Sequence, residues 1–351
     1  MIVPQWTFGS DPLSATADLS RFLLVQDTDA LPYNATIYRS LAGIGPAQNT
    51  DRFTHWWYWS QQNGLNQPEY LLPQIRVATT VAPFAFEQRF IDAGRNAPAQ
   101  QQVDALAPWA YQVEFGAVST LGVRNNADYF FHRYRASLLV DTASAIAGKH
   151  RAGMSVLDVG CHCGVFSLQL AERGFGHVTG MDLRPSNVRQ ADFLRDTFEV
   201  PNVLFVEKNV RRLGDFPVAD VVFCGGLLYH VTFPIDLIRD LWAKTGQFLV
   251  FDTITHNYPY SGFHLVCNKD VNYTAEGEFS YELHPTYRAV CDALYAVGFK
   301  VVYELIGSGA PDVPLYDAGN VRSFVASKTD DGLLAEFITQ LPRCRIAPPL
   351  E

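Results

Sequence analysis

The segment DVGCHCGVFS, residues 158–167, places two thiols and an imidazole between two glycines. Cysteine and histidine bind metals, but structural zinc sites usually space their thiols more widely than Cys161 and Cys163. The other candidate ligands show no local spacing typical of a metal site; they are His230, Asp252, His256 and His264. The sequence therefore favours a glycine loop that binds an organic ligand, and it predicts no metal site.

The glycines of this segment suit a ligand held at the start of a helix. Gly160 and Gly164 allow the backbone to turn sharply, and a helix that begins near Val165 offers free N–H groups. A nicotinamide or flavin fingerprint needs Gly-x-Gly-x-x-Gly, whereas this loop reads Gly-x-x-x-Gly after Asp158. The spacing therefore does not fit either dinucleotide fingerprint.

Strands and helices alternate after the loop. Short apolar runs are separated by amphipathic segments of helix length; these runs cover residues 155–159, 177–181, 203–206, 221–224 and 248–251. This alternation is typical of a parallel sheet with helices on both faces. A helix over 285–297 follows, then two strands over 300–306 and 321–327. The sequence predicts an α/β fold whose last two strands form an antiparallel hairpin at one end of the sheet.

The glycine loop resembles the first motif of class I S-adenosylmethionine-dependent methyltransferases, Asp/Glu-x-Gly-x-Gly-x-Gly, with His162 in place of the middle glycine. The order of elements from residue 153 to residue 328 is similar as well. The resemblance implies a Rossmann-like sheet that holds S-adenosylmethionine at the carboxyl ends of its strands. It also implies that Gly160 and Gly164 border the methionine part of this donor and that Asp158 helps to hold its ammonium group.

His162 departs from the motif without ending the turn. Histidine is among the residues enriched at positive φ, and Cys161 is small enough for the same turn. We expect both residues to contact the donor. His162 is expected to project toward the methionine or the acceptor and to tune the binding of one of them.

Polar residues follow the second and third strands. The carboxylate of Asp182, 24 residues after Asp158, can accept both ribose hydroxyl hydrogens; the alternative is a helix-capping aspartate. Asn209 stands where the resembling family often has an acid that accepts the adenine amino group, and its carbonyl oxygen can do the same. Leu183 and Val210 follow them. We expect these four residues to bind the adenosine part.

The fourth strand runs into Gly-Gly-Leu-Leu-Tyr-His, residues 225–230, and then into Pro-x-Asp-x-Ile-x-x-Leu. This segment is similar to the tRNA wobble-uridine carboxymethyltransferases and their relatives. The resemblance places Gly226 against the donor and Tyr229 and His230 close to its sulfonium. Imidazole titrates near physiological pH, so His230 is the first candidate for a general base. A histidine that only packs and hydrogen-bonds is the alternative, because many methyl transfers need no base.

The fifth strand leads into a long connection without clear periodicity. Asp252 and His256 at its start, and His264 within it, are secondary candidates for orientation or proton transfer. Connections of this length are usually lids or binding loops. We expect residues 253–284 to form a lid or an acceptor-binding insertion.

The N-terminal part differs from the rest in texture. It shows no clear periodicity and is rich in aromatic residues, above all in FTHWWYWSQQNG at 53–64. Such a segment predicts a hydrophobic core or a subunit interface. The alternative is an aromatic wall over an acceptor pocket. One helix is expected over 127–146. We therefore divide the chain into an N-terminal mixed cap at 1–126, for substrate binding or homo-oligomerisation, and a methyltransferase domain at 127–351.

The amino-acid composition narrows the possible binding partners and the cellular location of the protein. The net charge of −9 gives no general attraction to polyanions, so nucleic acid is not an expected partner. No secretory signal or membrane-spanning segment is evident, which indicates a cytoplasmic protein with six reduced cysteines.

The expected function is methyl transfer from S-adenosylmethionine to a small molecule at a hydroxyl group. One alternative is an RNA (tRNA uridine) methyl- or carboxymethyltransferase, and another is a non-enzymatic domain that binds the cofactor or a partner. A carboxylated donor would require a basic residue near the transferred group.

Overall fold

The computed structural model of the chain describes residues 19–25, 72–120, 126–258, 260–267, 281–308, 313–317 and 319–344. The aromatic segment at 53–64 lies outside these ranges, so its expected role stays a prediction. In the described parts of the chain, no helix combines the length and the apolar character needed to cross a membrane.

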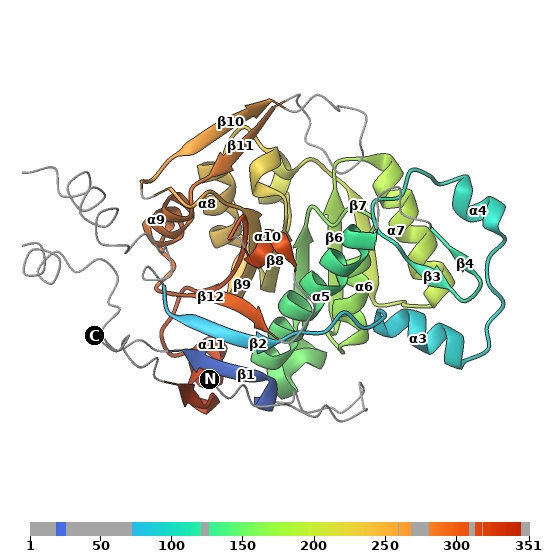
Figure 1. Cartoon of the computed structure of the whole chain (residues 1–351), viewed down its shortest axis with the longest axis horizontal. Helices are drawn as coiled ribbons and strands as arrows, with labels where there is room; N and C mark the ends of the chain where they lie inside the picture. Colours follow the sequence, from blue (N-terminus) through green and yellow to red (C-terminus); the bar gives the residue numbers. More distant parts are fainter. Residues whose placement is uncertain are drawn as a thin grey trace, which may run out of the picture.

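One sheet of ten strands forms the centre of the described structure (Figure 1). Its strands are β1 (Phe22–Val25), β2 (Gln74–Ala78), β5 (Ser155–Val159), β6 (His177–Asp182), β7 (Val203–Glu207), β8 (Ala219–Gly225), β9 (Thr245–Ile254), β12 (Val301–Ser308), β13 (Val321–Ser327) and β14 (Arg343–Cys344). Their order is β14-β1-β2-β12-β13-β9-β8-β5-β6-β7, and β9-β8-β5-β6-β7 are parallel neighbours. The predicted α/β, Rossmann-like, mostly parallel fold is confirmed.

Helices cover both faces of the sheet. One hydrophobic cluster contains side chains of α5 (Asn126–Ala147), α6 (Val165–Glu172), α7 (Pro185–Phe198) and α11 (Leu333–Gln340), and a second contains those of α8 (Pro234–Lys244) and α9 (Tyr287–Val297). Successive strand residues point to opposite faces. In β8, Val221 and Phe223 belong to the first cluster and Val222 and Cys224 to the second. Burial on both faces explains why the strands read as continuous apolar runs.

The predicted pairing of the last two long strands is confirmed, but their predicted place is wrong. β12 and β13 are antiparallel, yet β2 pairs parallel with β12 and is followed by β1 and β14. Gln74 of β2 also donates a side-chain hydrogen bond to Glu304, 230 residues later in the chain. No local pattern marks a partner so far away. The sheet therefore crosses residue 126, the expected boundary between cap and domain.

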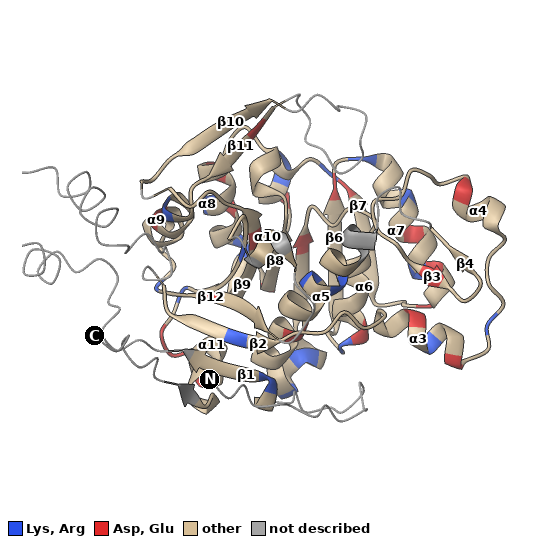
Figure 2. Cartoon of the chain, viewed as in Figure 1, with Lys and Arg blue, Asp and Glu red and all other residues tan. Residues whose placement is uncertain are grey.

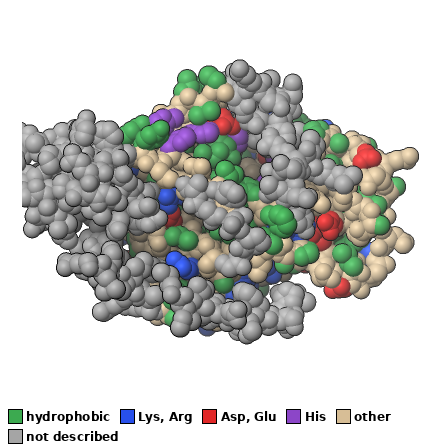
Figure 3. Space-filling view, viewed as in Figure 1, with side chains coloured by type: hydrophobic (Ala, Val, Ile, Leu, Met, Phe, Trp, Pro, Cys, Tyr) green, Lys and Arg blue, Asp and Glu red, His purple; other side chains and the backbone are tan. Residues whose placement is uncertain are grey.

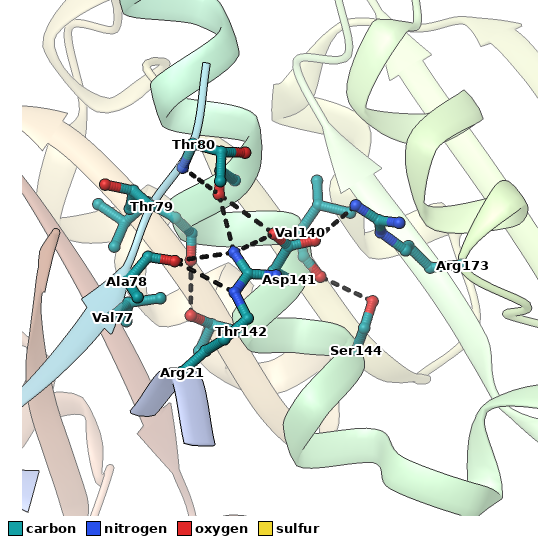
Figure 4. Close-up of polar contacts among 12 residues, drawn as sticks. Arg21, Val77, Ala78, Thr79, Thr80, Val140, Asp141, Thr142, Ser144 and Arg173 are labelled. Carbon is teal, nitrogen blue, oxygen red and sulfur yellow. Dashed lines mark hydrogen bonds and ion pairs between the residues drawn. The ribbon is translucent and has the colours of Figure 1, made fainter. Parts of the chain in front are cut away.

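A polar cluster fastens the N-terminal strands to α5 (Figure 4). Arg21, just before β1, donates to the carbonyl oxygen of Ala78 and to Asp141 Oδ2, both at 2.8 Å, and to Ser137 Oγ at 3.1 Å. Arg173 lies 2.7 Å from the other carboxylate oxygen of Asp141. These charge-assisted contacts hold β1 and β2 against the first helix of the predicted domain.

The remaining N-terminal elements are α3 (Ala85–Asp92), α4 (Gln100–Asp104), β3 (Glu114–Phe115) and β4 (Val118–Ser119). Of these, α3 packs against α6, α7 and β3, while α4 contacts β4. Glu87 of α3 is buried, pairs with Arg133 of α5 at 2.9 Å, and accepts the N–H groups of Phe84 and Glu114. Figure 1 shows this group to one side of the sheet. It positions the segment before β3, which carries Tyr111, close to the glycine loop.

The connection after β9 contains a hairpin, where the sequence predicted no regular structure. β10 (Phe263–Cys267) pairs antiparallel with β11 (Tyr281–Pro285), and residues 259 and 268–280 lie outside the described ranges. α9 begins at Tyr287 instead of residue 285, because the hydroxyl of Thr286 accepts the N–H of Ala289 as an N-cap. The hairpin packs against the short helix η5 (Leu228–His230) that follows β8.

Candidate active site

The glycine loop connects β5 to α6 through three residues in the left-handed region. Gly160 and Gly164 both have φ of 78°, and His162 has φ of 51°. The N–H of Gly160 donates to the carbonyl oxygen of Met181 in β6 at 2.9 Å. A Cβ on Gly164 would lie 2.4 Å from the ring of Phe205. Both conformation and close packing therefore require glycine at Gly164.

The two cysteines of the loop fill space in a packed turn. Cys161 and Cys163 are buried, and burial raises the pKa of both thiols. Within the described ranges, no three His, Cys, Asp or Glu side chains are arranged to hold a metal ion. Neutral thiols suit a packed turn.

Asp158 is the next-to-last residue of β5 and lies in an enclosed position. It is 2% exposed and accepts a hydrogen bond from Ser167 Oγ of α6 at 2.6 Å. Burial raises the pKa of Asp158 to about 7. A cation beside it would favour the ionised form again. This environment suits the ammonium group that the resemblance assigns to Asp158, which stays a prediction.

The carboxylate of Asp182 is held in one orientation at the end of β6. It accepts the N–H of His162 at 3.0 Å, the N–H of Arg184 at 2.9 Å and the side-chain amide of Asn187 at 3.0 Å. Arg184 precedes α7, so the helix-capping alternative and the ribose role both agree with these contacts. Leu183 beside it is 42% exposed, an open apolar surface at the same edge.

Asn209 and Val210 lie where β7 ends and the short helix η4 (Val210–Asp215) begins. Asn209 Oδ1 accepts the N–H of Arg211 at 2.9 Å. A carbonyl oxygen has two lone pairs, so one is left for an adenine amino group. Val210 packs against the second hydrophobic cluster. The adenine contact remains a prediction.

His162 meets Tyr111 beside the loop, with ring centroids 5.5 Å apart. Its Nδ1 accepts the N–H of Cys163 at 2.7 Å, while its buried Nε2 has no hydrogen-bond partner in the described part of the chain. Burial lowers the pKa of His162 to about 4, although Asp182 opposes this shift. A buried polar atom without a partner, next to a left-handed glycine loop, fits a site that takes a polar ligand.

A buried charge cluster lies against Gly226 at the end of β8. Arg135 of α5 forms an ion pair with Asp252 of β9, which also accepts from Tyr316 Oη at 2.7 Å and from Ser323 Oγ at 2.6 Å. Gly226 has φ of 81°, and a Cβ there would lie 2.9 Å from the Arg135 guanidinium. Asp252 is fully buried. Its carboxylate is already bound to Arg135, Tyr316 and Ser323. This arrangement does not favour the predicted role of Asp252 in proton transfer.

Tyr229 and His230 are the last two residues of η5, which packs against the hairpin. Glu282 of β11 lies between two imidazoles, with Oε1 2.9 Å from His230 Nδ1 and Oε2 2.6 Å from His284 Nε2. The side chains of His230, Glu282 and His284 are 13%, 8% and 12% exposed. The ring of Tyr229 lies 4.0 Å from that of His230. His230 is also near enough to His162 to oppose protonation of the loop histidine. The predicted base thus sits beside the predicted donor loop.

Two further predicted histidines join this group. The ring of His256 stacks on His284 at 5.5 Å and lies 5.0 Å from that of His264, whose Nε2 is 3.1 Å from the hydroxyl of Tyr260. Burial, with His284 and His264 nearby, lowers the pKa of His256. Figure 3 shows histidine side chains gathered on one face of the molecule. We refer to His230, His256, His264, His284 and Glu282 as the histidine cluster.

Sequence reasoning missed four residues of this site: Tyr111, Arg135, Glu282 and His284. Glu282 and His284 carry a signal, because residues two apart on a strand point to the same side. Arg135 lies in an apolar helix, and its partner Asp252 is 117 residues away. No local pattern could join that pair.

A family model described as a methyltransferase domain matches residues 131–304, from α5 into β12. The chain therefore contains a methyltransferase domain at residues 131–304, in agreement with the resemblance to the class I S-adenosylmethionine-dependent methyltransferases. This methyltransferase domain contains the glycine loop, Asp182, η5 and the histidine cluster.

Two curated relatives are similar to part of the methyltransferase domain. The tRNA U34 carboxymethyltransferase of Helicobacter acinonychis (strain Sheeba) is 32% identical over 109 residues, 30% of this chain and 42% of that protein. The ubiquinone biosynthesis O-methyltransferase of Albidiferax ferrireducens (strain ATCC BAA-621 / DSM 15236 / T118) is 34% identical over 113 residues, again 30% of this chain and 43% of that protein. The chain thus spans less than half the length of these two relatives.

A solved structure resembles the fold. The N-terminal domain of EvdMO1, crystallised in the presence of SAH and D-fucose, has a TM-score of 0.51 and 21% sequence identity. The similarity covers 65% of this chain and 94% of that one. It agrees with the Rossmann-like architecture described above.

Proposed function

We propose that the chain transfers a methyl group from S-adenosylmethionine to a hydroxyl group of a small molecule. The observation that carries the proposal is the place of His230 at the end of β8, largely buried and at ion-pair distance from Glu282. Ligands of open α/β sheets bind at the carboxyl ends of the strands. A buried imidazole at this edge supplies a proton acceptor where a hydroxyl would need one.

The donor fits the residues at the ends of β5, β6 and β7. Asp182 presents an oriented carboxylate for the ribose hydroxyls, Asn209 keeps a lone pair for the adenine amino group, and Asp158 suits the ammonium group. His162 Nε2 is a further polar atom without a described partner at this loop. When bound, S-adenosylmethionine supplies a methyl group on a positively charged sulfur.

The proposed step requires little covalent chemistry from the protein itself. The acceptor oxygen bonds to the methyl carbon, the sulfur–carbon bond breaks with its electron pair left on sulfur, and the hydroxyl proton goes to the imidazole of His230. Such displacements depend on alignment and exclusion of water. The hairpin packed on η5 provides an enclosure for His230.

Transfer of a methyl or carboxymethyl group to a tRNA uridine is the alternative function that the curated relatives suggest. A carboxylated donor would need a cation near the transferred group, and Arg135, the buried cation beside Gly226, is ion-paired with Asp252. Lys and Arg residues are interspersed with acidic ones over the described elements (Figure 2), and the net charge is −9. These features favour a small acceptor over a polyanion.

Isothermal titration with S-adenosylmethionine tests the donor assignment. Asp182→Ala is expected to weaken binding about 10- to 100-fold, because it removes charge-assisted hydrogen bonds. Asp196→Ala is the matched control, since the Asp196 side chain is 70% exposed. Absence of binding to the wild type, or undiminished binding to Asp182→Ala, would contradict the proposal.

Transfer of a radiolabelled methyl group tests the acceptor class. The wild-type chain is incubated with labelled S-adenosylmethionine and either a panel of sugars, phenols and alcohols or bulk tRNA. We expect label in the small-molecule fraction. Label confined to tRNA, and lost as salt rises, would establish the RNA alternative. Intact donor binding with no label in either fraction would support a non-enzymatic domain.

A further inference from the structure

We propose that Tyr258 and Tyr260 form a platform that binds a sugar ring of the acceptor, outside the place of methyl transfer. The acceptor is thus a glycoside or an oligosaccharide of two or more rings. This inference rests on the proposed function and extends it to the acceptor class. We refer to the side chains of Tyr258 and Tyr260 as the tyrosine platform.

The tyrosine platform is an exposed pair of nearly parallel rings. Tyr258 is 51% exposed and Tyr260 is 41% exposed, and their ring centroids lie 5.6 Å apart with planes inclined by 18°. On the face shown in Figure 3, hydrophobic side chains, a class that includes tyrosine in that figure, border the histidines. Exposed apolar surface with a polar rim is typical of binding sites. The platform therefore offers a flat aromatic surface beside the histidine cluster.

The segment that carries the platform is fastened to the start of α9. The Thr286 hydroxyl donates to the carbonyl oxygen of Tyr260 at 2.5 Å, and the Thr286 N–H donates to that of Gly262 at 2.9 Å. The N–H of His256 donates to the carbonyl oxygen of Pro285, also at 2.9 Å. A surface whose backbone is already held loses little conformational freedom when a ligand binds. The platform is therefore preorganised for binding.

A series of ring contacts leads from the platform inward to His230. It runs through Tyr258, His256, His284, Tyr229 and His230, with neighbouring centroids 4.0–6.0 Å apart. Exposure falls along it, from 51% for Tyr258 to 13% for the side chain of His230. Two imidazoles lie between the tyrosines at its ends, so a molecule that reaches both the platform and His230 must be longer than a single sugar ring.

Polar groups around the platform suit the hydroxyls of a sugar. Tyr260 Oη lies 3.1 Å from His264 Nε2. Ser261, next in the chain, donates to the carboxylate of Asp292. The Nε2 atom of His256 is buried and has no hydrogen-bond partner among the described residues, so it is left for a ligand hydroxyl. The C–H groups of a sugar pack on an aromatic face, which carries partial negative charge, while its hydroxyls bond to such a rim.

The charges near the platform favour an uncharged ligand over a nucleic acid. Arg288 of α9 is ion-paired with Asp292 at 2.8 Å, and Glu282 brings a carboxylate into the histidine cluster. Burial lowers the pKa of His256 below the ordinary value of 6.5, so its ring is neutral at pH 7. A phosphate chain binds through cations, whereas the charges named here are paired or negative. An uncharged saccharide therefore fits this surface better.

Titration of the full chain with saccharides tests the platform before the natural acceptor is known. The probes are methyl glycosides of glucose, galactose and mannose, together with di- and trisaccharides that end in the same sugars. Calorimetry measures the dissociation constants, and saturation-transfer NMR detects weaker binding. We expect a di- or trisaccharide to bind at least about 10-fold more tightly than the matching methyl glycoside, because only the longer molecule reaches the platform and the inner rings together.

Substitutions in the platform separate the aromatic face from the hydroxyl. Tyr258→Ala and Tyr260→Ala are each expected to weaken that binding by about 5- to 20-fold, because an aromatic face is lost. Tyr258→Phe keeps the face and is expected to stay within about 3-fold of wild type. Tyr295→Ala is the matched control, since Tyr295 is 44% exposed on α9 and lies outside the series. For a saccharide that accepts labelled methyl groups, the platform variants should raise KM and leave kcat unchanged, as loss of uniform binding does.

The outcomes distinguish the platform from the proposed function. Thermal melting checks that each variant folds. If no saccharide binds the wild type, or if both alanine variants bind as tightly as the wild type, the inference is overturned while donor binding stands. Oligouridine that binds in place of saccharides and is lost in Tyr258→Ala would assign the platform to RNA and overturn the inference as well. A wild-type chain that binds saccharides at the platform but no S-adenosylmethionine would overturn the proposed function and support the carbohydrate site.

Discussion

The proposed donor end and the proposed acceptor end of the methyltransferase domain hold their carboxylates in different ways. Asp182 receives neutral N–H groups from His162, Arg184 and Asn187, all within 20 residues of it. Glu282 instead lies between two imidazoles, one of them on a separate element. Neutral donors keep a carboxylate in place at any pH at which it is ionised, whereas imidazoles gain and lose protons near pH 7.

In the proposed function, this difference distinguishes a site that recognises the donor from a site that contains a general base. At the donor end, hydrogen bonds between residues close together in the sequence, and glycines in the left-handed region, fix the shape of the loop. At the acceptor end, the hairpin brings titratable rings against η5. Rigid local structure suits a donor that must be aligned, and a titratable cluster suits an acceptor that must lose a proton. Four changes test this contrast.

Gly164→Ala should damage the donor end most. The new Cβ would lie 2.4 Å from Phe205, and alanine is strained at a φ of 78°. We expect a loss of about 2–4 kcal/mol in the free energy of unfolding, together with loss of donor binding. Chemical denaturation and calorimetry measure both. Gly214→Ala is the control, because a Cβ there meets nothing within 4 Å. Equal stability of the two variants would show that the loop is not tightly packed.

His230→Gln should damage the acceptor end and spare the donor end. Turnover of a hydroxyl acceptor is expected to fall about 10²- to 10⁴-fold through loss of the base, with an unchanged dissociation constant for S-adenosylmethionine. Steady-state kinetics and calorimetry report the two quantities, with His177→Gln as control. Wild-type turnover in His230→Gln would mean that this histidine packs and takes no proton.

Asp158→Asn should stabilise the folded chain at alkaline pH. Burial raises the pKa of Asp158 from 3.8 to about 7, so the folded state keeps a proton that the unfolded state releases, and stability falls as pH rises from about 4 to about 7. The amide carries no charge and can still accept from Ser167. We expect the variant to gain about 2–4 kcal/mol over wild type at pH 8 and no difference of this kind at pH 4. A constant difference across this range in chemical denaturation would contradict the raised pKa.

His162→Gly should have the smallest effect. The imidazole Nε2 has no described partner, and glycine takes a φ of 51° freely. Loss of one hydrogen bond to a bound donor would weaken binding by about 3- to 10-fold. Calorimetry and turnover measure the change. If both stay at wild-type values, His162 is a tolerated variant of the motif.

Prediction from sequence worked where partners are close along the chain. The five parallel strands, the helix over 127–146 and the antiparallel pairing of β12 with β13 follow from local periodicity, and the structure confirms them. The strands β1, β2 and β14, and the hairpin β10–β11, were missed because short segments with distant partners carry little local signal. The same limit applies to the candidate site residue Asp252. Its ion pair could not be predicted from the sequence, because its partner Arg135 is 117 residues away.

The sequence by itself determined the α/β fold class and the glycine loop, because strand and turn preferences act over a few residues. It also pointed to Asp158, Asp182 and His230 as the residues that could do chemistry. Only the tertiary structure decided which charges meet. It put Asp252 into a buried ion pair and set Glu282 between His230 and His284. Electrostatic interactions depend on distance and burial in space, and neither can be read from position along the chain.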